Sequence, residues 1–591
     1  MLDIERAVTS RYPALANRSP LIRKPALALL RKLSRETEIN HFLQEHGQAR
    51  GLDFIDRIFD YFHVSYSVSR RERDNIPATG KVVIIANHPI GSLDGLALLR
   101  LVSEVRQDIK IIANDMLLAF GQLEDLFLPL DNMTRTGYLR SYKHILQALD
   151  QQQAVIVFPA GEVSRAGTRG IRDGKWQSGF LRLARKSAAP VLPVFIGARN
   201  SLLFYSASFI FKPLATALLA NEMFNKRSAD IRFRIGEVIP AQALASDHLS
   251  DPALIKRLKK HVYKIGKGKQ ALFVSEKTIA HPEDCGQLRK ELKSAQQLGS
   301  TRDKHRIYLC QYDQHPTVMK EIGRLREIAF RMVGEGTGSR RDLDKYDHYY
   351  QHLVLWDDDK LAIAGAYRLG VCGDILQQRG MDALYTANLF HYREGALQFL
   401  PQAIELGRSF VNPAYWGKAS LEYLWQGLGA WLRHHPHIRY VIGPVSMSAS
   451  YPMVLRDLLV YYYQRYYQPM DSRVTGRHPH LISTELLASF KTRFAQLERH
   501  QAFAEMQRQF HEKGHKVPTL FKQYAALYED GGYQLLAFSV DSDFGQCIDG
   551  LFMGDLTMMK TEKRQRYLSS TEDQPVPAHQ PPAVIAQALP V

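Results

Sequence analysis

The sequence predicts an α/β protein with two domains, and three observations support this prediction. From Gly80 onward, short β-branched runs alternate with helical segments, which is typical of a sheet covered by helices on both faces. A polar, charged stretch at residues 266–305 separates this region from a second pattern of strands and helices. The chain has 591 residues, of which 45% are hydrophobic, and this is sufficient for two hydrophobic cores.

A basic charge is the most informative property of the composition. The formal net charge is +17 and the isoelectric point is about 9.5. Such a charge favours a polyanionic partner, which is nucleic acid, an anionic membrane or an acidic protein. The sequence has no zinc-finger spacing, no RNA-binding aromatic signature and no long block of Lys and Arg. We therefore expect no nucleic-acid partner.

Cysteine and histidine usage predicts neither a disulfide framework nor a metal site. The four cysteines lie far apart and form no CxxC pair, which fits a reducing compartment. The histidine cluster HHPH at 434–437 has no acidic or cysteine partner at ligand spacing. We therefore interpret it as a solvated helix end.

The first predicted element is a basic helical segment over residues 1–75. Its run SPLIRKPALALLRKL interleaves leucines with Arg and Lys. A helix of this kind can lie in a membrane interface; packing against its own domain is the alternative. The N-terminus has acidic residues and lacks the apolar core of a secretory signal. No apolar run of about eighteen residues or more occurs, so we expect no transmembrane helix.

The first domain is predicted at 76–265 and contains a histidine–aspartate pair. Its strand-like runs end in the loops NHP and FPAGE, and parallel sheets carry their reactive groups in the loops after the strands. His88 with Asp94 across a glycine turn is the arrangement of a general base, because the carboxylate orients the imidazole and stabilises its protonated form. Neither a G-x-S-x-G motif nor a nearby cysteine supplies a nucleophile. We therefore expect His88 to deprotonate a substrate hydroxyl for attack on an acyl carbonyl.

These motifs resemble those of the glycerolipid acyltransferases related to lysophosphatidic acid acyltransferase. The family's N-H-x4-D, F-P-E-G-T-R-S and V-P-V-like motifs correspond here to NHPIGSLDG, FPAGEVSR and VLPVFIGA, in the same order, across about residues 75–230. The resemblance implies a glycerolipid-acyltransferase-like αβ domain in which His88 and Asp94 are catalytic. The substrate-binding residues are then Asn87, Arg135, Glu162 and Arg165.

The motifs depart from the family pattern in two places. Five residues, rather than four, separate the histidine from the aspartate, and Ala160 occupies the usual glutamate position. These variants resemble a hemolysin-like subgroup, which includes enzymes that O-acylate lyso-ornithine lipid, an acceptor without a phosphate. Arg135 and Arg165 are therefore candidates for binding the acceptor's carboxylate through paired hydrogen bonds. A solvated loop role for Arg165 and a turn-capping role for Glu162 are the alternatives.

The second domain is predicted at 306–560, after a linker at 266–305. The run YQHLVLWDDDKLAIAGAYRLG predicts two antiparallel strands, and LEYLWQGLGAWLRHH predicts an amphipathic helix before a further strand. The helix RLREIAFRMV, the acidic segment RRDLDKYD and the strand ELGRS resemble the ornithine N-acyltransferases and the acyl-homoserine lactone synthases. This resemblance covers about residues 306–465 and implies a GNAT-like α+β domain. The Pro-rich end, 561–591, is predicted to be disordered.

Charged residues in these motifs suit the acylation of an amino acid. This reaction needs carboxylates that bind the ammonium group and remove a proton, so Asp344, Asp347 and Glu405 are candidates, with Glu405 as the catalytic residue. The alternatives are helix-start caps for the aspartates and a strand-edge ion pair for Glu405. Arg408 is expected to bind the amino acid's carboxylate or the donor's phosphopantetheine, or to pair with Glu405 as scaffold. Ser409, in the same motif, is grouped with the substrate-binding residues.

Together the two domains resemble the bifunctional ornithine lipid synthases. The resemblance implies that the second domain transfers a 3-hydroxyacyl chain from acyl carrier protein to the α-amine of ornithine, and that the first domain then esterifies the 3-hydroxyl. No metal or other cofactor is expected, because the phosphopantetheine thioester of the donor already carries an activated carbonyl.

The expected partners are acyl carrier protein, anionic inner-membrane lipids, ornithine and the lyso-aminolipid. We therefore expect a peripheral protein at the cytoplasmic face of the inner membrane. Two alternatives remain open. One is a lysophospholipid acyltransferase with an inactive GNAT-like domain, and the other is a non-catalytic membrane adaptor.

Overall fold

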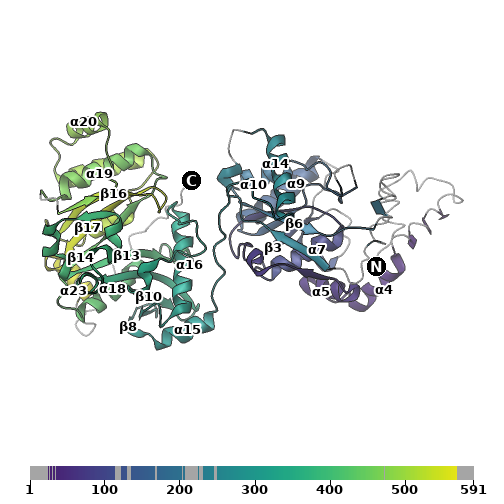
Figure 1. Cartoon of the computed structure of the whole chain (residues 1–591), viewed down its shortest axis with the longest axis horizontal. Coiled ribbons are helices and arrows are strands. Elements are labelled where there is room, and N and C mark those ends of the chain that lie inside the picture. The colour runs from purple at the N-terminus through teal and green to yellow at the C-terminus, as the bar shows by residue number, and fades with distance from the viewer. Residues whose placement is uncertain are drawn as a thin grey trace. The chain divides into compact units, whose positions relative to one another are not determined.

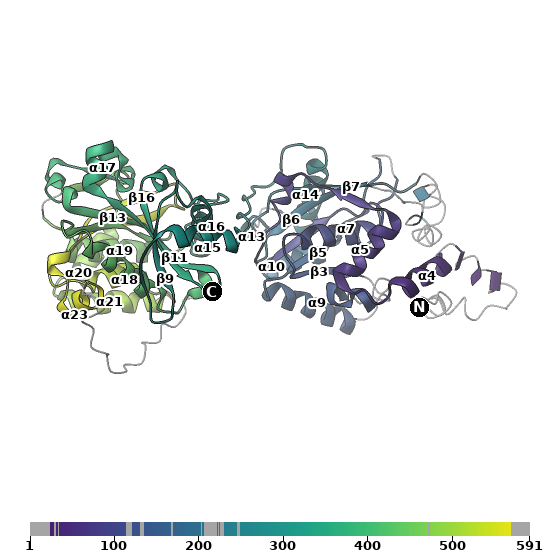
Figure 2. The ribbon, with the colours of Figure 1, turned by 90° about the horizontal axis from the view of Figure 1, so that it is seen from below.

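The chain forms two compact units in a computed structural model, Met1–His281 and Pro282–Val591 (Figure 1). Each unit is described by itself, and a second view is given in Figure 2. The structure describes residues 24–25, 27–28, 31–32, 35–113, 121–129, 135–166, 170–201, 204–205, 222, 224, 230–244, 249–470 and 473–568.

A mostly parallel sheet forms the centre of the first unit. Its strands follow the order β1-β7-β6-β2-β5-β3-β4. Strand β2 pairs in parallel with both β5 and β6, whereas β7 runs antiparallel to β6. The strands are β1 (Ser65–Ser67), β2 (Val82–Ala86), β3 (Ile109–Ala113), β4 (Phe127–Pro129), β5 (Ala154–Val157), β6 (Val191–Gly197) and β7 (Asp230–Ile235).

Helices cover both faces of this sheet, as predicted. Figure 1 shows α5 and α7 on one face of the sheet and α9, α10 and α14 on the other. Successive side chains of a strand point to opposite faces, so Ile84 packs with α5 and α7, whereas Val83 and Ile85 pack with α9, α10 and α14. The helices are α4 (Glu36–His46), α5 (Gly51–Phe62), α6 (Arg70–Arg73), α7 (Ser92–Ser103), η1 (Gly121–Leu126), α9 (Arg135–Asp150), α10 (Gly179–Lys186), α13 (Ala241–Leu244) and α14 (Asp251–Ile265). The two cores hold β2 rigidly, and the loop that follows β2 carries the histidine motif.

The second unit is built on a mixed sheet of strand order β16-β17-β14-β13-β11-β10-β9-β8. The predicted antiparallel pair is confirmed as β10 and β11. The strands are β8 (Gln296–Ser300), β9 (Arg306–Cys310), β10 (Gln351–Asp357), β11 (Ala362–Val371), β13 (Ala403–Val411), β14 (Tyr440–Met447), β16 (Tyr533–Asp541) and β17 (Cys547–Asp555). A separate small pair is formed by β12 (Phe390–Tyr392) and β15 (Val474–Gly476).

Different groups of helices pack on the two faces of this sheet. Helices α18 and α19 pack with Leu353 and Val441 on one face, and α16 packs with Val354 and Ala366 on the other. The helices are α15 (Cys285–Ser294), α16 (Pro316–Met332), α17 (Cys372–Arg379), α18 (Ser420–Arg433), α19 (Met453–Tyr467), α20 (Thr484–Arg493), α21 (Arg499–Glu512), α22 (Thr519–Ala525) and α23 (Thr561–Leu568). The short 3₁₀ turns η2 (Lys345–His348) and η4 (Tyr385–Asn388) contribute Tyr346 and Tyr385 to a further hydrophobic cluster of the second unit.

The parallel pair β13–β14 opens along its length. The two strands pair at Ala403–Glu405 with Tyr440–Ile442, and the pairing stops there. Beyond that point β13 continues to pair with β11, and β14 continues to pair with β17. Strand β13 also bulges against β11, where Arg408 adopts a φ of 48°, in the left-handed region that non-glycine residues seldom occupy. The strands therefore part next to the predicted ELGRS motif.

Three predicted boundaries differ from the structure. The linker at 266–305 is shorter than predicted, because Leu288 and Leu292 of α15 pack into the core of the second unit. The tail at 561–591 begins with helix α23, whose Tyr567 packs against Trp425, and the residues after 568 lie outside the described part of the chain. Of the basic segment at 1–75, α4 and α5 pack on the first sheet. The predicted amphipathic run within that segment lies mostly outside the described residues.

The length and apolar character needed to cross a bilayer are not found in any helix among the described residues.

Candidate active sites

The first site forms in the tight turn between β2 and α7. Strand β2 ends at Ala86, His88 follows, and α7 begins at Ser92. Gly91 has a φ of 105°, a conformation that residues with a side chain rarely adopt. This turn brings the first helical turn of α7 back to the histidine, and Asp94 lies on that turn.

His88 and Asp94 form a close pair, as the sequence predicted. The His88 Nδ1 atom lies 2.8 Å from the Asp94 Oδ1 atom, and the histidine side chain is 19% exposed while the aspartate is fully buried. The other carboxylate oxygen of Asp94 accepts hydrogen bonds from the backbone N–H groups of Ile90 and Gly91, at 2.9 and 3.3 Å. The imidazole also stacks on Phe158, with ring centroids 4.2 Å apart. The carboxylate is thus held in place, and Nε2 remains as the nitrogen that can act as base.

The electrostatic surroundings of His88 favour its protonated form. Burial lowers the pKa of the imidazole, but the negative charges of Asp94 and Asp173 outweigh burial and raise the pKa above its usual value. A raised pKa strengthens the imidazole as a proton acceptor. The arrangement therefore suits a base that takes a proton from a weakly acidic hydroxyl.

Asp173 is a residue that sequence reasoning missed. One of its carboxylate oxygens accepts hydrogen bonds from the His88 backbone N–H at 3.2 Å and the Ser164 hydroxyl at 2.5 Å. The other oxygen accepts a hydrogen bond from the Trp176 indole at 2.8 Å. Ser164 in turn donates its backbone N–H to the His88 carbonyl at 2.7 Å. Asp173 therefore connects the loop after FPAGE to the histidine loop. It lies outside both motifs in the sequence, so neither motif pointed to it.

The predicted substrate-binding residues of this unit differ in their partners and in their exposure to solvent. The amide of Asn87 donates to the carbonyl of Ile196 at 3.0 Å and accepts from its N–H at 2.7 Å, so this side chain anchors the loop to β6. Glu162 is exposed and lies 3.3 Å from the half-buried Arg165. Arg135 begins α9, and its side chain lies outside the described residues. Substrate contacts for these residues stay a prediction.

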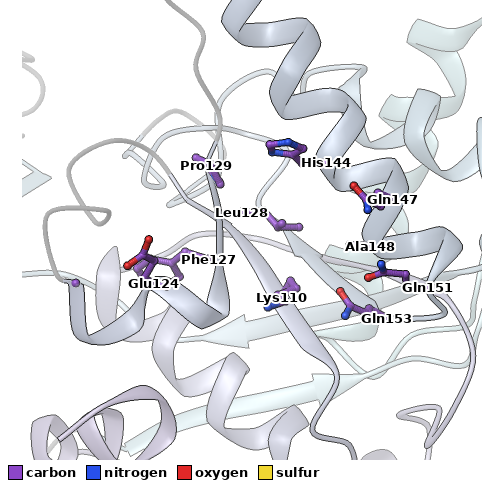
Figure 3. A pocket seen from close by; sticks show the side chains of 11 residues that line it. Lys110, Glu124, Phe127, Leu128, Pro129, His144, Gln147, Ala148, Gln151 and Gln153 are labelled. Atoms are coloured by element: carbon purple, nitrogen blue, oxygen red, sulfur yellow. The ribbon is translucent and has the colours of Figure 1, made fainter.

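A hollow of about 690 Å³ beside β4 and α9 lies away from His88. Figure 3 shows Lys110 and Gln153 lining it, together with His144 and Gln147. Lys110 and Gln153 mark the amino ends of β3 and β5, whereas His88 follows the carboxyl end of the parallel strand β2. Because reactive groups of parallel sheets gather at the carboxyl ends, the histidine loop rather than this hollow is the candidate active site of the first unit.

The second site is a buried cluster of charged residues on the α16 face of the second sheet. Asp347 lies at its centre and is fully buried, with Arg326 Nη1 2.8 Å and Arg368 Nη1 3.3 Å from its Oδ1 atom. Burial raises the pKa of Asp347, but the charges of the two arginines and of the nearby His352 outweigh burial and lower it. Asp347 therefore remains ionised and serves as the counter-ion of two buried guanidinium groups.

Asp344 and Asp347 also cap the short turn η2, which is the alternative that the sequence left open. Asp344 accepts the backbone N–H of Tyr346 at 2.9 Å, and Asp347 accepts the backbone N–H of Asp344 at 2.8 Å. Arg368 donates a further hydrogen bond to Asp344 at 2.6 Å. These contacts occupy the carboxylates with the protein's own groups, and ammonium binding by either aspartate stays a prediction.

Glu405 is buried in a pocket of hydrogen-bond donors. The Tyr350 hydroxyl and the Tyr385 N–H donate to one carboxylate oxygen, and the Thr386 N–H donates to the other at 2.7 Å. Burial raises the pKa of Glu405, and the hydrogen bonds oppose this rise without cancelling it. No ion pair joins Glu405 to Arg408 within the described residues, so the scaffold pairing considered for them is absent there.

Arg408 and Ser409 point toward different environments. The Arg408 Nε atom lies 3.3 Å from Asp342 and its Nη2 atom 3.7 Å from Asp344, on the α16 face. The Ser409 hydroxyl instead interacts with the hydroxyls of Tyr367 and Tyr524, which belong to the core on the opposite face. The structure therefore brings Arg408 together with the aspartates and places Ser409 away from them.

Several partners in this cluster were missed by sequence reasoning. Arg326, Asp342, His352 and Arg368 are all buried and all contact or neighbour the predicted residues. Arg326 and Asp342 lie inside the quoted motifs RLREIAFRMV and RRDLDKYD, so the sequence offered a basis for naming them as candidates. His352 and Arg368 lie in strands that read as ordinary core, and nothing local distinguished them.

Comparisons with known proteins agree with this architecture. An acyltransferase family matches residues 6–266, and an acetyltransferase (GNAT) domain matches residues 325–426. A glycine N(α)-acyltransferase of Bacteroides thetaiotaomicron is 30% identical over 305 residues, which are 49% of this chain and 90% of the relative. A lyso-glycine lipid O-acyltransferase of the same organism is 28% identical over 274 residues, 45% of this chain and 97% of the relative. An L-ornithine N(α)-acyltransferase of Brucella abortus is 31% identical over 144 residues, 22% of this chain and 49% of the relative.

The fold and the two sites define an acyltransferase in which an acyltransferase-type domain precedes a GNAT domain. The chain belongs to the same family as the bacterial glycine N(α)-acyltransferases, because it is 30% identical to one of them over 90% of that relative's length. The pairing of the two domains in one chain is the pairing expected of the bifunctional ornithine lipid synthases.

Proposed function

We propose that the chain makes an amino-acid lipid through two successive acyl transfers. The GNAT unit transfers a 3-hydroxyacyl chain from acyl carrier protein to the α-amine of ornithine. The first unit then transfers a second acyl group to the 3-hydroxyl of that lyso-lipid. The observation that carries the proposal is that one chain resembles both amino-acid N-acyltransferases and a lyso-aminolipid O-acyltransferase.

Glycine is a second candidate for the acylated amino acid. The relative named for glycine matches 305 residues of this chain, whereas the relative named for ornithine matches 144 residues. The longer match favours glycine, while the HPxGxxDG and FPAGE motifs resemble enzymes that act on lyso-ornithine lipid. Supplying each amino acid separately distinguishes the two candidates.

The His88–Asp94 pair supports base catalysis in the O-acyl transfer. Nε2 of His88 takes the proton of the lyso-lipid hydroxyl, and the hydroxyl oxygen attacks the thioester carbonyl carbon. A carbon–oxygen bond forms, the carbon–sulfur bond breaks, and the leaving sulfur takes the proton from the imidazolium. Asp94 stabilises the imidazolium between these two events, since its Oδ1 atom lies 2.8 Å from Nδ1.

The opening between β13 and β14 supports binding of the N-acyl donor. Peptide groups of β13 beyond Glu405 have no ladder partner on the β14 side. An extended amide chain, such as the phosphopantetheine arm of acyl carrier protein, offers hydrogen-bonding groups to such an unpaired strand. The arm would bring the thioester close to Arg408 and its aspartate neighbours.

Lipid analysis tests the proposed function directly. The chain and its His88→Ala variant are each expressed in a bacterial host that lacks aminolipids, and the total lipids are measured by mass spectrometry with ornithine or glycine supplied. We expect a diacylated aminolipid from the wild-type chain. The variant is expected to accumulate the monoacylated lipid, because loss of a general base slows a reaction by about 10²- to 10⁴-fold.

Two outcomes contradict the proposal. Absence of any aminolipid with the wild-type chain would favour a lysophospholipid acceptor and an inactive GNAT unit. Equal amounts of diacylated lipid from both proteins would exclude His88 as the base.

A further inference from the structure

A second group of ionisable side chains lies next to the parted strands, outside the motifs that the sequence singled out. Asp549 lies on β17 directly opposite Ser446 of β14, and Asp541 ends the neighbouring strand β16. Both aspartates interact electrostatically with Arg408 of β13 and with Tyr385 of η4. Residues from four neighbouring strands thus converge on one face of the sheet.

Asp549 is a buried carboxylate that makes no ion pair with the described residues, although the charge of Arg408 acts on it. Its side chain is 2% exposed. Its Oδ1 atom accepts a hydrogen bond from the Ser446 hydroxyl at 2.5 Å and contacts the Cys547 sulfur at 3.7 Å. The described residues provide neither an ion pair to this carboxylate nor a hydrogen-bond donor to its Oδ2 atom. Because an unpaired buried charge is costly, this carboxylate is suited to a cation that arrives as a ligand.

Arg408 forms the opposite wall and is only partly satisfied by the protein. Its guanidinium group lies between two rings, 5.1 Å from the Tyr385 centroid and 4.7 Å from the Phe544 centroid. Its Nε atom makes no hydrogen bond with the described residues, although Asp342 lies 3.3 Å away. The guanidinium group therefore retains donors for an anionic group.

We propose that Asp549 and Arg408 bind the two charged ends of a zwitterionic α-amino acid. Arg408 binds the carboxylate, and Asp549 accepts the α-ammonium and takes one of its protons. This inference rests on the proposed N-acylation and adds the residue that activates the amine. Asp344, Asp347 and Glu405 were the predicted candidates for this role, but their oxygens already accept hydrogen bonds from arginines, a tyrosine or backbone groups.

The proposed step balances without a further reactant. The ammonium transfers one proton to the Asp549 carboxylate, and the resulting amine attacks the thioester carbonyl carbon. A carbon–nitrogen bond forms and the carbon–sulfur bond breaks. The leaving sulfur takes the second nitrogen proton, and Asp549 later releases its proton to water.

The titration of Asp549 gives the step a pH dependence. The groups that face Asp549 are Ser446, Cys547, Asp541, Glu335, Arg408 and Tyr385. Burial raises the pKa of Asp549 to about 6, and the negative charge of Asp541 also contributes to the rise. Because the proton acceptor must be ionised, we expect N-acylation to increase as the pH rises through about 6 and to be lost below it.

Steady-state kinetics of the full chain test the proposal. The rate of N-acylation is measured against pH and against amino-acid concentration, with saturating acyl thioester, for the wild type, Asp549→Asn, Asp549→Glu and the control Asp555→Asn. Asp555 lies on the same strand but pairs with Arg439 at the surface. We expect Asp549→Asn to lower kcat/KM by about 10²- to 10⁴-fold and to remove the acidic limb of the pH profile. Asp549→Glu is expected to recover part of the rate, and Asp555→Asn to match the wild type.

Two readouts separate this inference from a folding defect and from the proposed function. In Asp549→Asn, O-acylation of a synthetic lyso-lipid by the first unit must stay unchanged, and the thermal melting temperature must not fall, because the substitution removes a buried charge. A wild-type-like rate and pH profile in this variant would overturn the inference and leave the proposed function intact. A wild-type chain that acylates neither ornithine nor glycine would overturn the proposed function, and this inference with it.

Discussion

Asp94 and Asp347 are both fully buried carboxylates, but their different neighbours give them different roles. Asp347 lies between Arg326 and Arg368 and stays ionised as part of the scaffold. Asp94 instead has backbone donors on one oxygen and the imidazole of His88 on the other. The role of a buried carboxylate therefore depends on its partner. A histidine changes its charge near neutral pH, so its carboxylate partner can assist proton transfer, whereas an arginine stays charged and forms a permanent ion pair.

Replacement of Asp94 by Asn tests this distinction. The variant loses the negative charge that raises the pKa of His88, so the pKa of His88 falls. A base must be unprotonated, so the acidic limb of the O-acylation profile is expected to move to lower pH. The rate on the plateau is expected to fall by about 10²- to 10⁴-fold, because the imidazolium loses its stabilising charge. The measurement is kcat for O-acylation between pH 5 and about 9.

N-acylation serves as the control for Asp94→Asn, since it uses the other unit. A variant that keeps the wild-type acidic limb would show that Asp94 does not set the pKa of His88. A variant that also loses N-acylation would indicate a defect in the whole chain.

At the element scale, the opening between β13 and β14 depends on how closely the two strands approach before they part. Gly443 follows Ile442, the last residue of β14 that pairs with β13, and a Cβ atom placed on Gly443 would lie 2.3 Å from the carbonyl oxygen of Leu406. Contacts this short cannot persist, so one of the strands has to shift. The position thus requires glycine through a close backbone approach.

A Gly443→Ala substitution is expected to disturb the parted strands. We expect N-acylation to fall at least about tenfold, since displacements of about 1 Å at a reacting site can cost about 10²-fold. O-acylation by the first unit is expected to remain at the wild-type level. Gly299→Ala is the matched control, because it lies on strand β8 of the same sheet and its added Cβ meets no atom within 4 Å. Equal N-acylation in both variants would contradict the role given to this approach.

Local pattern was sufficient to predict the elements that carry the motifs. The strand before His88, the β10–β11 hairpin and helix α18 each show their pattern of apolar residues within a short stretch of sequence, so the pattern can be recognised without knowing the fold. The His88–Asp94 pair was also predictable, because one tight turn joins its two residues. Asp173 and Asp549 were not, because Asp173 meets His88, and Asp549 meets Ser446, only after distant segments pair. The same reason explains why α15 was assigned to a linker: its short apolar face has a partner only in the folded unit.

At the scale of the whole molecule, the net charge of +17 predicts salt-sensitive binding of an acidic donor. Raising the ionic strength shortens the Debye length, which is about 10 Å at about 0.1 M. The KM for acyl carrier protein is therefore expected to rise as salt is added, while the KM for an uncharged acyl-pantetheine thioester stays constant. Measuring both over the same salt series checks this. A parallel rise for both donors would show that salt acts on the enzyme rather than on the encounter.

The order of the two units has a consequence for how the chain is synthesised. Each unit has its own hydrophobic cores, and domains generally fold in the order in which the ribosome releases them. Under the proposed reactions, the O-acylating unit is therefore complete before the N-acylating unit exists. A prematurely terminated chain would contain the consumer of the lyso-lipid without its producer. The cell would then not accumulate the lyso-lipid, a single-chain amphiphile that disrupts bilayers as a detergent does.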